Sequence, residues 1–221
     1  MASRKPAKGR PPASLARGAE QTRADILSAA THEFAGKGFA GAHVDNIAAL
    51  TQTSKRMIYY HFGNKEGLYL AVLESAYGQA RIEEARLRLD GLTPEAAMRT
   101  LVRFRFDYHN DHPDYIRLVM NENILNGRHL AGSKRIGSLS SPAIETIRGI
   151  YERGVEAGVF RRGLDLLNIH MSISSLSFHN VSNRHTFTIL FGRDWGSLEE
   201  LRARRAHVED MILRYMTDSG R

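Results

Sequence analysis

Cysteine is absent from the 221 residues of this chain. Its absence excludes disulfides, thiolate zinc sites, iron–sulfur clusters and cysteine nucleophiles, and it leaves the cytosol as the expected compartment. Long apolar runs are absent as well, since no stretch of 18 apolar residues is available for a membrane-spanning helix. The N-terminal segment also lacks the apolar block of a secretory signal. We therefore expect a cytoplasmic protein that does not act on membranes.

Acidic residues are missing from residues 1–19, although five basic residues lie there: Arg4, Lys5, Lys8, Arg10 and Arg17. The whole chain has 31 Lys and Arg against 24 Asp and Glu, a net charge of +7, so this short segment supplies most of the surplus. A basic surplus in one polar segment favours a polyanionic partner. The prolines of the segment prevent the amphipathic helix that a membrane surface requires. Nucleic acid and a merely solvated tail remain as the alternatives.

Strand patterns are scarce, because no convincing alternation of apolar and polar residues extends over six or more positions. Helical patterns cover almost the whole chain instead, and 42% hydrophobic with 25% charged residues is typical of an ordinary globular protein. We predict an all-α fold of about nine helices with a loop at 127–141. The expected ranges are 22 to 36–38, 45–51, 54–60, 65–89, 94–110, 114–125, 142–157, 165–182 and 197–217.

Two of these helices are short and are joined by the turn Thr51-Gln52-Thr53. Two short helices joined by a tight turn, next to a longer helix, form the helix-turn-helix unit, and the major groove of B-DNA admits one α-helix. The second short helix, 54–60, buries Ile58 and presents Lys55, Arg56, Tyr59 and Tyr60. Arginine is the side chain best suited to read guanine, so Arg56 is the first candidate for sequence specificity. A solvated basic helix face is the alternative.

Three groups of residues in this region resemble the tetracycline-repressor (TetR) family of bacterial transcription regulators: Ile47-Ala48 through Ser54, Tyr59-Tyr60-His61-Phe62, and Lys65-Glu66 at the start of a long helix. The resemblance covers residues 20–72. It implies an α-helical homodimer that binds a palindromic operator through its N-terminal heads and releases it when a small molecule binds the C-terminal domain. The chain then divides into a basic flexible arm (1–18), a helix-turn-helix domain (19–66) and a ligand-binding and dimerisation domain (67–221).

Two positions depart from the family pattern. Gln52 stands where the family turn usually has a glycine with positive φ, so Gln52 must adopt a left-handed conformation or the turn must change shape. His43 stands where a threonine usually caps the second helix and touches a phosphate. The resemblance also implies that Tyr60 packs against the first helix and that Lys65 meets a phosphate. The implied DNA-contacting residues are Arg10, Arg23, His43, Thr53, Ser54, Lys55, Arg56, Tyr59, Tyr60, His61 and Lys65.

Three other motifs have competing interpretations. Lys8-Gly9-Arg10-Pro11 resembles the core of an AT-hook, which inserts arginine into a narrow minor groove, and a non-specific basic tail is the alternative. The glycines of 36–41 match the spacing of a dinucleotide-binding loop, but a helix ends there, which favours a left-handed cap. The run His109-Asn110-Asp111-His112 has metal-binding residue types, but Pro113 favours a helix-end role. We expect no metal and no cofactor.

The C-terminal part contains the expected ligand pocket. Helices 114–125 and 165–182 are apolar nearly all round and are therefore expected to be buried. Their polar residues (Asn121, Glu122, Asn123, Ser174, Ser175 and His179) either satisfy one another or line a cavity. Aromatic residues at Phe104, Tyr108, Tyr151 and Phe178 provide its walls. We predict that these residues line a single pocket.

The last predicted helix places apolar residues along one side: Leu198, Leu201, Val208, Met211, Ile212 and Tyr215. Such a stripe suits a two-fold four-helix interface, and coverage of the chain's own core is the alternative. These observations together predict a ligand-responsive, dimeric DNA-binding transcriptional regulator that represses its genes, with double-stranded DNA, a second copy and a small effector as partners. The alternatives are an architectural DNA binder without effector and a small-molecule enzyme. No trio of acid, base and nucleophile supports the enzyme.

Overall fold

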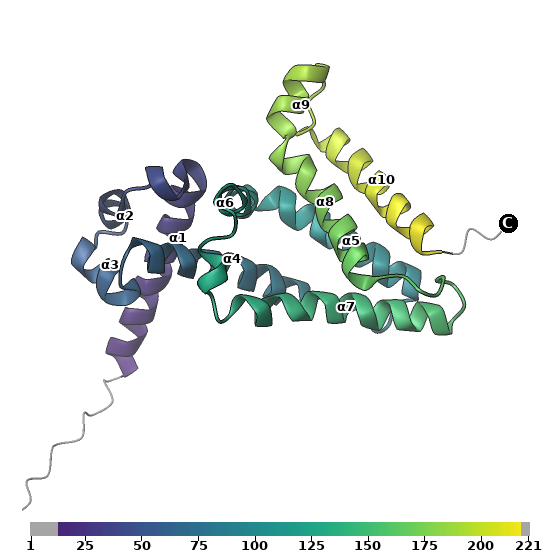
Figure 1. The fold of residues 1–221 in the computed structure, drawn as a ribbon, viewed down its shortest axis with the longest axis horizontal. Helices are drawn as coiled ribbons and strands as arrows, with labels where there is room; N and C mark the ends of the chain where they lie inside the picture. Colours follow the sequence, from purple (N-terminus) through teal and green to yellow (C-terminus); the bar gives the residue numbers. More distant parts are fainter. Residues whose placement is uncertain (1–12, 218–221) are drawn as a thin grey trace, which may run out of the picture. The chain divides into compact units, whose positions relative to one another are not determined.

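A computed structural model describes residues 13–217 of the chain, so Arg10 and the AT-hook-like motif lie outside the described residues. Ten α-helices and one 3-10 turn make up the described part, which contains no β-strand beyond a single isolated bridge (Figure 1). The predicted all-α class is confirmed. The helices are α1 (Ala13–Gly41), α2 (Val44–Leu50), α3 (Lys55–Phe62), α4 (Lys65–Glu84), α5 (Pro94–Asp111), α6 (Pro113–Ile124), α7 (Ile136–Glu156), α8 (Leu166–Ser182), α9 (Arg184–Phe191) and α10 (Leu198–Met216).

The helices fall into two compact units that divide between Ala71 and Val72, within α4, where the sequence predicted a boundary after residue 66. The first unit contains α1, α2, α3 and the start of α4. Its core is formed by side chains spaced at helical intervals, all fully buried: Ile26, Ala30, Phe34, Ile47, Ile58, Leu68 and Tyr69. The ring of Phe34 meets that of Tyr69 edge to face at 4.9 Å, which joins α1 to α4.

Helix α1 begins earlier than predicted. It starts at Ala13, so residues 13–18, which the sequence assigned to the flexible arm, form its first turns. Residue 22, the expected helix start, therefore lies inside α1, where the Thr22 hydroxyl donates to the Gly18 carbonyl at 2.9 Å. The alanines of this segment favour a helix and outweigh one glycine. The predicted break at the glycines is confirmed at Gly38, whose φ is 67°.

The second unit is built around α5, which packs against α6, α7, α8 and α10. Its buried face consists of apolar residues three and four positions apart: Ala97, Met98, Leu101, Val102 and Phe106. These side chains join one core with Ile147 and Ile150 of α7, Ile169 and Ile173 of α8, and Val208 and Ile212 of α10. None of the helices between residues 13 and 217 has both the length and the apolar character that crossing a bilayer requires.

Two expected helix boundaries in this unit are wrong, and one helix was not expected. Helix α4 ends at Glu84 and not near Leu89, because Leu89 turns back into the core and Arg153 donates to its carbonyl at 3.1 Å. Helix α7 begins at Ile136 and continues through Pro142, which was expected to start it. The Ser133 hydroxyl accepts from the N–H of Ile136 at 3.1 Å and so stabilises this earlier start. Helix α9 lies where no helix was expected.

Candidate nucleic-acid interface and ligand cavity

Helices α2 and α3 and the turn between them have the geometry of a helix-turn-helix. Gln52 takes a φ of 50°, the left-handed conformation that the missing glycine requires, and the N–H of Thr53 donates to the Ala48 carbonyl at 3.0 Å. The turn therefore keeps its shape at the expense of some backbone strain. Ser54 caps α3, because its hydroxyl accepts from the N–H of Met57 at 3.1 Å. Ile58 is fully buried, as predicted, and anchors α3.

The outer side of α3 is polar and exposed. Lys55, Arg56 and Tyr60 are exposed, whereas Tyr59 is half-buried. Arg56 makes no ion pair with any residue between 13 and 217. Tyr60 is 80% exposed, so the expectation that it packs against α1 is wrong. Residue 60 is two positions after the buried Ile58 and therefore lies on the opposite side of the helix.

Lys55 is held by an ion pair across the turn. Its Nζ lies 2.9 Å from Oδ2 of Asp45 on α2. The hydrogen bond to Asp45, and then the carboxylate charge, raise the pKa of Lys55. Both side chains are exposed, so the pair is open to exchange with another anion.

The start of α2 is capped without a threonine. The His43 side chain makes no capping bond. Instead the buried carboxylate of Glu33, on α1, accepts from the His43 N–H and from the side chains of Asn46 and Lys37, each at 3.0 Å. Burial raises the pKa of Glu33, but these hydrogen bonds outweigh it and lower the pKa overall. The exposed imidazole of His43 is therefore not needed to hold α2.

The other residues that are expected to contact DNA lie around the helix-turn-helix. Arg23 of α1 lies over the Phe62 ring at 5.2 Å, and Thr53 and His61 are half-buried. Lys65 donates to the Ala40 carbonyl at 3.3 Å and lies 5.0 Å from the centroid of Phe39. Asn64 caps α4 by accepting from the N–H of Gly67 at 2.7 Å.

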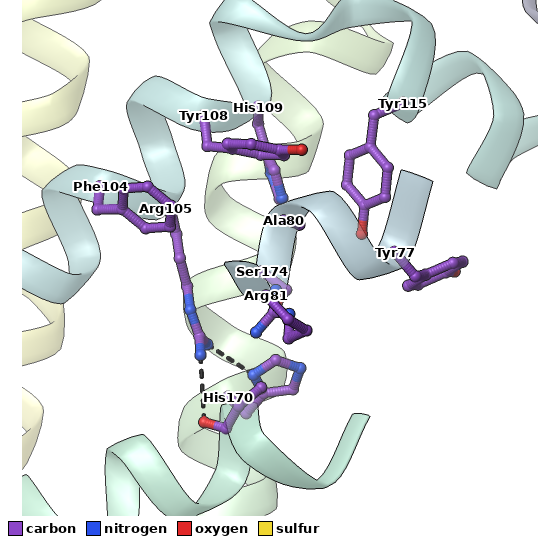
Figure 2. Close-up of a pocket in the computed structure, with 11 residues that line it drawn as sticks. Tyr77, Ala80, Arg81, Phe104, Arg105, Tyr108, His109, Tyr115, His170 and Ser174 are labelled. Carbon is purple, nitrogen blue, oxygen red and sulfur yellow. Dashed lines mark hydrogen bonds between the residues drawn. The ribbon is translucent and has the colours of Figure 1, made fainter. Parts of the chain in front are cut away.

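A cavity of about 90 Å³ lies within the second unit (Figure 2). Helices α4, α5, α6, α7 and α8 contribute its walls: Tyr77, Ala80, Arg81, Phe104, Arg105, Tyr108, His109, Tyr115, Ala143, His170 and Ser174. Three of these, Phe104, Tyr108 and Ser174, were predicted from the sequence. The cavity thus combines aromatic walls with two guanidinium groups and two imidazoles.

Arg105 organises one side of the cavity. Its Nε and Nη2 donate to the two carboxylate oxygens of Glu84 at 3.1 and 3.0 Å, and Nη2 also donates to the Ala143 carbonyl. Its Nη1 lies 2.6 Å from Nδ1 of His170, as the dashed line in Figure 2 marks. A guanidinium only donates, so Nδ1 of His170 accepts and the neutral ring carries its proton on Nε2. Burial, and then the charges of Arg105 and Arg81, lower the pKa of His170 to about 4.

Aromatic and imidazole groups form the other side. Burial, and then Arg105, lower the pKa of His109 to about 4, and its Nδ1 has no hydrogen-bond partner among the described residues. Burial raises the pKa of Tyr108 to about 12 and raises that of Tyr115 further. The Tyr115 ring meets those of Tyr77 and Tyr108 edge to face at 5.6 and 5.9 Å. These groups are therefore uncharged at neutral pH.

The other residues predicted for the pocket lie elsewhere, so the prediction of a single shared pocket is wrong. Glu122 is buried, but it accepts from the N–H groups of His129 and Leu130 and so holds the turn after α6. The Tyr151 hydroxyl donates to the Arg161 carbonyl and accepts from the N–H of Leu164. The remaining side chains do not line this cavity: Asn121, Asn123, Ser175, Phe178 and His179. His179 lines a separate hollow, and Phe178 lies 6.5 Å from His109.

Arg105 is the main residue that sequence reasoning missed. It lies within the apolar face of α5, next to Leu101, Val102 and Phe106. A charged side chain at such a position requires a buried partner, and this pattern was available in the sequence. Its partners Glu84 and His170, however, come from distant parts of the chain.

The apolar stripe of α10 is divided between two roles. Val208 and Ile212 are buried and Leu201 packs against the core, so these three cover the chain's own core and are not free for an interface. Leu198, Met211 and Tyr215 are exposed. Two apolar residues of α8, Leu167 and Met171, are also exposed at 63% and 60%. Exposed apolar residues therefore lie on both α8 and α10, and α9 adds Ile189, Leu190 and Phe191.

Comparisons with known proteins match both units. Residues 26–72 match the family model "Bacterial regulatory proteins, tetR family", and residues 94–212 match "Tetracyclin repressor-like, C-terminal domain". The HTH-type transcriptional repressor NicS of Pseudomonas putida is 36% identical over 196 residues, which cover 89% of this chain and 92% of NicS. The HTH-type transcriptional regulator RutR of Escherichia coli is 34% identical over 116 residues, 52% of this chain and 54% of RutR.

Solved structures show the same fold. A TetR-family regulatory protein from Rhodococcus RHA1 superposes with a TM-score of 0.70 at 20% identity, over 90% of this chain and 99% of that one. KstR2, a ketosteroid transcriptional regulator of Mycobacterium tuberculosis, gives 0.65 at 18% identity, over 89% and 95%. With the family models matching both units and a relative aligned along most of its length, the chain belongs to the TetR family of DNA-binding bacterial transcription regulators.

Proposed function

We propose that the protein is a dimeric repressor that binds a palindromic operator and leaves it when a small effector enters the cavity of the second unit. The observation that carries this proposal is the exposed side of α3, where Arg56 and Tyr60 extend from a short helix anchored by the buried Ile58. A helix of this kind fits the major groove and can contact base edges. Because the chromosome is the target, the protein acts in the cytoplasm.

DNA recognition is divided between base edges and phosphates. Arg56 has no competing ion pair among the described residues and is free to read guanine. Three basic residues lie at helix starts: His43 before α2, Lys55 in α3 and Lys65 in α4. Contacts from such positions to phosphates fix the register of the protein on the duplex. The basic N-terminal segment, including Arg10, adds contacts along the backbone or in the minor groove.

Dimerisation places two heads on one duplex. The exposed apolar residues Leu167 and Met171 of α8, with Met211 and Tyr215 of α10, supply a surface that two copies can bury against each other. A symmetric dimer reads two half-sites when its α3 helices are separated by about 34–36 Å, one turn of B-DNA.

Helix α4 provides the connection between ligand and DNA. Its first turns contribute Leu68 and Tyr69 to the core of the head, and its later turns contribute Tyr77, Ala80 and Arg81 to the cavity. A ligand that favours one position of these later turns alters the separation of the two heads. It shifts the equilibrium only if it binds the DNA-free conformation more tightly.

Selection of binding sites from a random duplex library tests this proposal. The full-length protein should enrich an inverted repeat, and two chains should bind each selected duplex. An architectural DNA binder enriches no sequence, and that outcome would refute the proposal. A double variant, Met171→Glu with Met211→Glu, places charge on the apolar surface and should be monomeric in analytical ultracentrifugation. Leu190→Glu, at an apolar residue of α9 that is 71% exposed, is the control and should remain dimeric.

A further inference from the structure

Every polar side chain that lines the cavity can donate a hydrogen bond, and none of them is a carboxylate. The acid closest to its guanidinium groups is Glu84, and both of its oxygens are already engaged by Arg105 and Arg81 at 2.9 to 3.1 Å. Beyond the effect of burial, the charges of Arg105 and Arg81 lower the pKa of both His109 and His170, and only Glu84 opposes them at His170. The carboxylates of Glu83 and Glu122 act instead on Tyr108 and Tyr77. A buried positive charge of this kind favours an anion.

The histidines add donors and no second charge. Arg105 occupies Nδ1 of His170, so Nε2–H is the group that His170 offers to a ligand. The hydroxyls of Tyr77, Tyr108 and Tyr115 make no hydrogen bond to any residue of the described chain. Arg81 uses only Nη1 toward Glu84. The cavity therefore offers several donors from different helices to one group of acceptors.

The size of the cavity limits the ligand. Pockets for drug-sized molecules measure about 300–1,000 Å³, whereas this cavity measures about 90 Å³. The walls are flat, because Phe104, Tyr108 and Tyr115 present rings to the space (Figure 2). The volume favours a small ligand, and the flat faces of a planar ligand can pack against these aromatic rings.

From these observations we infer that the effector is a planar monocarboxylate with no more than one aromatic ring. The carboxylate accepts from Arg81, His170 Nε2–H and a tyrosine hydroxyl, while the ring lies among Phe104, Tyr108 and Tyr115. Charge-assisted hydrogen bonds to a carboxylate are about twice as strong as neutral ones, which gives the site its preference for the anion. This inference rests on the proposed function, since it assigns the ligand class of the same cavity.

Calorimetric titration of the full-length protein, without DNA, tests the ligand class with three probes of one shape. Benzoate, benzamide and benzamidine share a ring and a trigonal substituent but carry charges of −1, 0 and +1. Benzoate should bind at least tenfold more tightly than benzamide, and benzamidine should not bind. The larger 2-naphthoate should bind more weakly than benzoate because its second ring exceeds the cavity.

Two variants localise the preference. Arg81→Met removes the charge and keeps the aliphatic stem, so the ratio of benzoate to benzamide affinity should fall toward one, and Arg81→Lys should restore part of it. Arg148→Met, an exposed change on α7, is the control and should keep the ratio. Tyr115→Phe removes one hydroxyl and no ion pair. It should weaken benzoate by about tenfold even if Arg81→Met unfolds at the assay temperature.

The outcomes separate this inference from the proposed function. Tighter binding of benzamide or benzamidine than of benzoate would overturn the assigned ligand class, as would no binding of any probe by protein that selects an operator. Neither result affects the repressor proposal, which depends on the selected DNA. Benzoate binding with an unchanged affinity ratio in Arg81→Met would equally contradict the assignment.

Discussion

Nζ of Lys55 on α3 lies 2.9 Å from Oδ2 of Asp45 on α2, so a carboxylate already pairs with this lysine when no DNA is bound. Asp45→Asn should therefore free the ammonium group for a phosphate. We expect tighter binding to any duplex and a salt dependence steeper by up to about one unit of the log–log slope. Fluorescence anisotropy over a series of salt concentrations measures both.

Asp210→Asn is the control for this prediction, because Asp210 pairs with Arg214 at 2.7 Å on the exposed side of α10. It removes the same charge from the second unit. If both variants change the slope equally, the ion pair in the head has no particular role in DNA binding.

The two glycines Gly149 and Gly154 of α7 should respond oppositely to alanine. A Cβ on Gly154 would lie 1.9 Å from Cδ2 of the buried Phe160, whereas a Cβ on Gly149 meets no atom within 4 Å. Gly154→Ala should lower the free energy of unfolding by about 1–3 kcal/mol through overpacking. Gly149→Ala should raise it by about 0.5–1 kcal/mol. Urea unfolding measures both, and a similar loss in the two variants would contradict the packing.

Backbone strain at Gln52 gives a third prediction. Its φ of 50° is unfavourable for a side chain with Cβ, so Gln52→Gly should stabilise the head by roughly 1 kcal/mol. The neighbouring Thr51 has a φ of −98°, and its hydroxyl donates to the Ile47 carbonyl at 2.8 Å. Thr51→Gly should therefore destabilise the protein. Thermal unfolding distinguishes the two, and a loss of stability in Gln52→Gly would show that the turn is not strained.

Stability should fall in mild acid because of His109. Burial, and then the charge of Arg105, hold the pKa of His109 at about 4, against 6.5 in its unperturbed state. The unfolded chain therefore takes up a proton as the pH falls below 6.5, and the folded protein does so only near 4. The free energy of unfolding should decrease across this window, by roughly 3 kcal/mol from this group.

The His109→Phe variant removes this titration. Denaturant unfolding at several pH values between 7 and 4 should show a shallower decline for His109→Phe than for the wild type. Equal slopes would mean that His109 does not stay neutral in the folded protein.

Helix starts with a local cap could be predicted from the sequence. Thr93, Asp165 and Ser197 each accept from N–H groups within the first turn of the helix they precede, and such contacts involve only neighbouring residues. The end of α4 depends instead on Arg153, which is more than 60 residues away from the carbonyls it binds. No local pattern records such a contact.

The two candidate sites differ in the same way, because one depends on local contacts and the other on contacts between distant parts of the chain. The helix-turn-helix lies within about twenty consecutive residues, so its turn, its cap and the buried Ile58 follow from spacing. The cavity depends on Arg105, Glu84 and His170, which are separated by 21 and 65 positions. The polar residues of α6 were assigned to the pocket because burial of Glu122 could be inferred, whereas its partners at His129 and Leu130 could not.

Arg56 provides the most direct test of the central claim, that α3 reads base sequence. The measurement compares the binding affinities of the wild type and of Arg56→Ala. Each protein is titrated with the selected operator and with a scrambled duplex of the same length, at the same salt concentration. We predict that the operator loses about 1–3 kcal/mol of binding free energy, while the scrambled duplex loses no more than one phosphate contact would supply. An equal loss on both duplexes would contradict the account, because Arg56 would then act only as a charge.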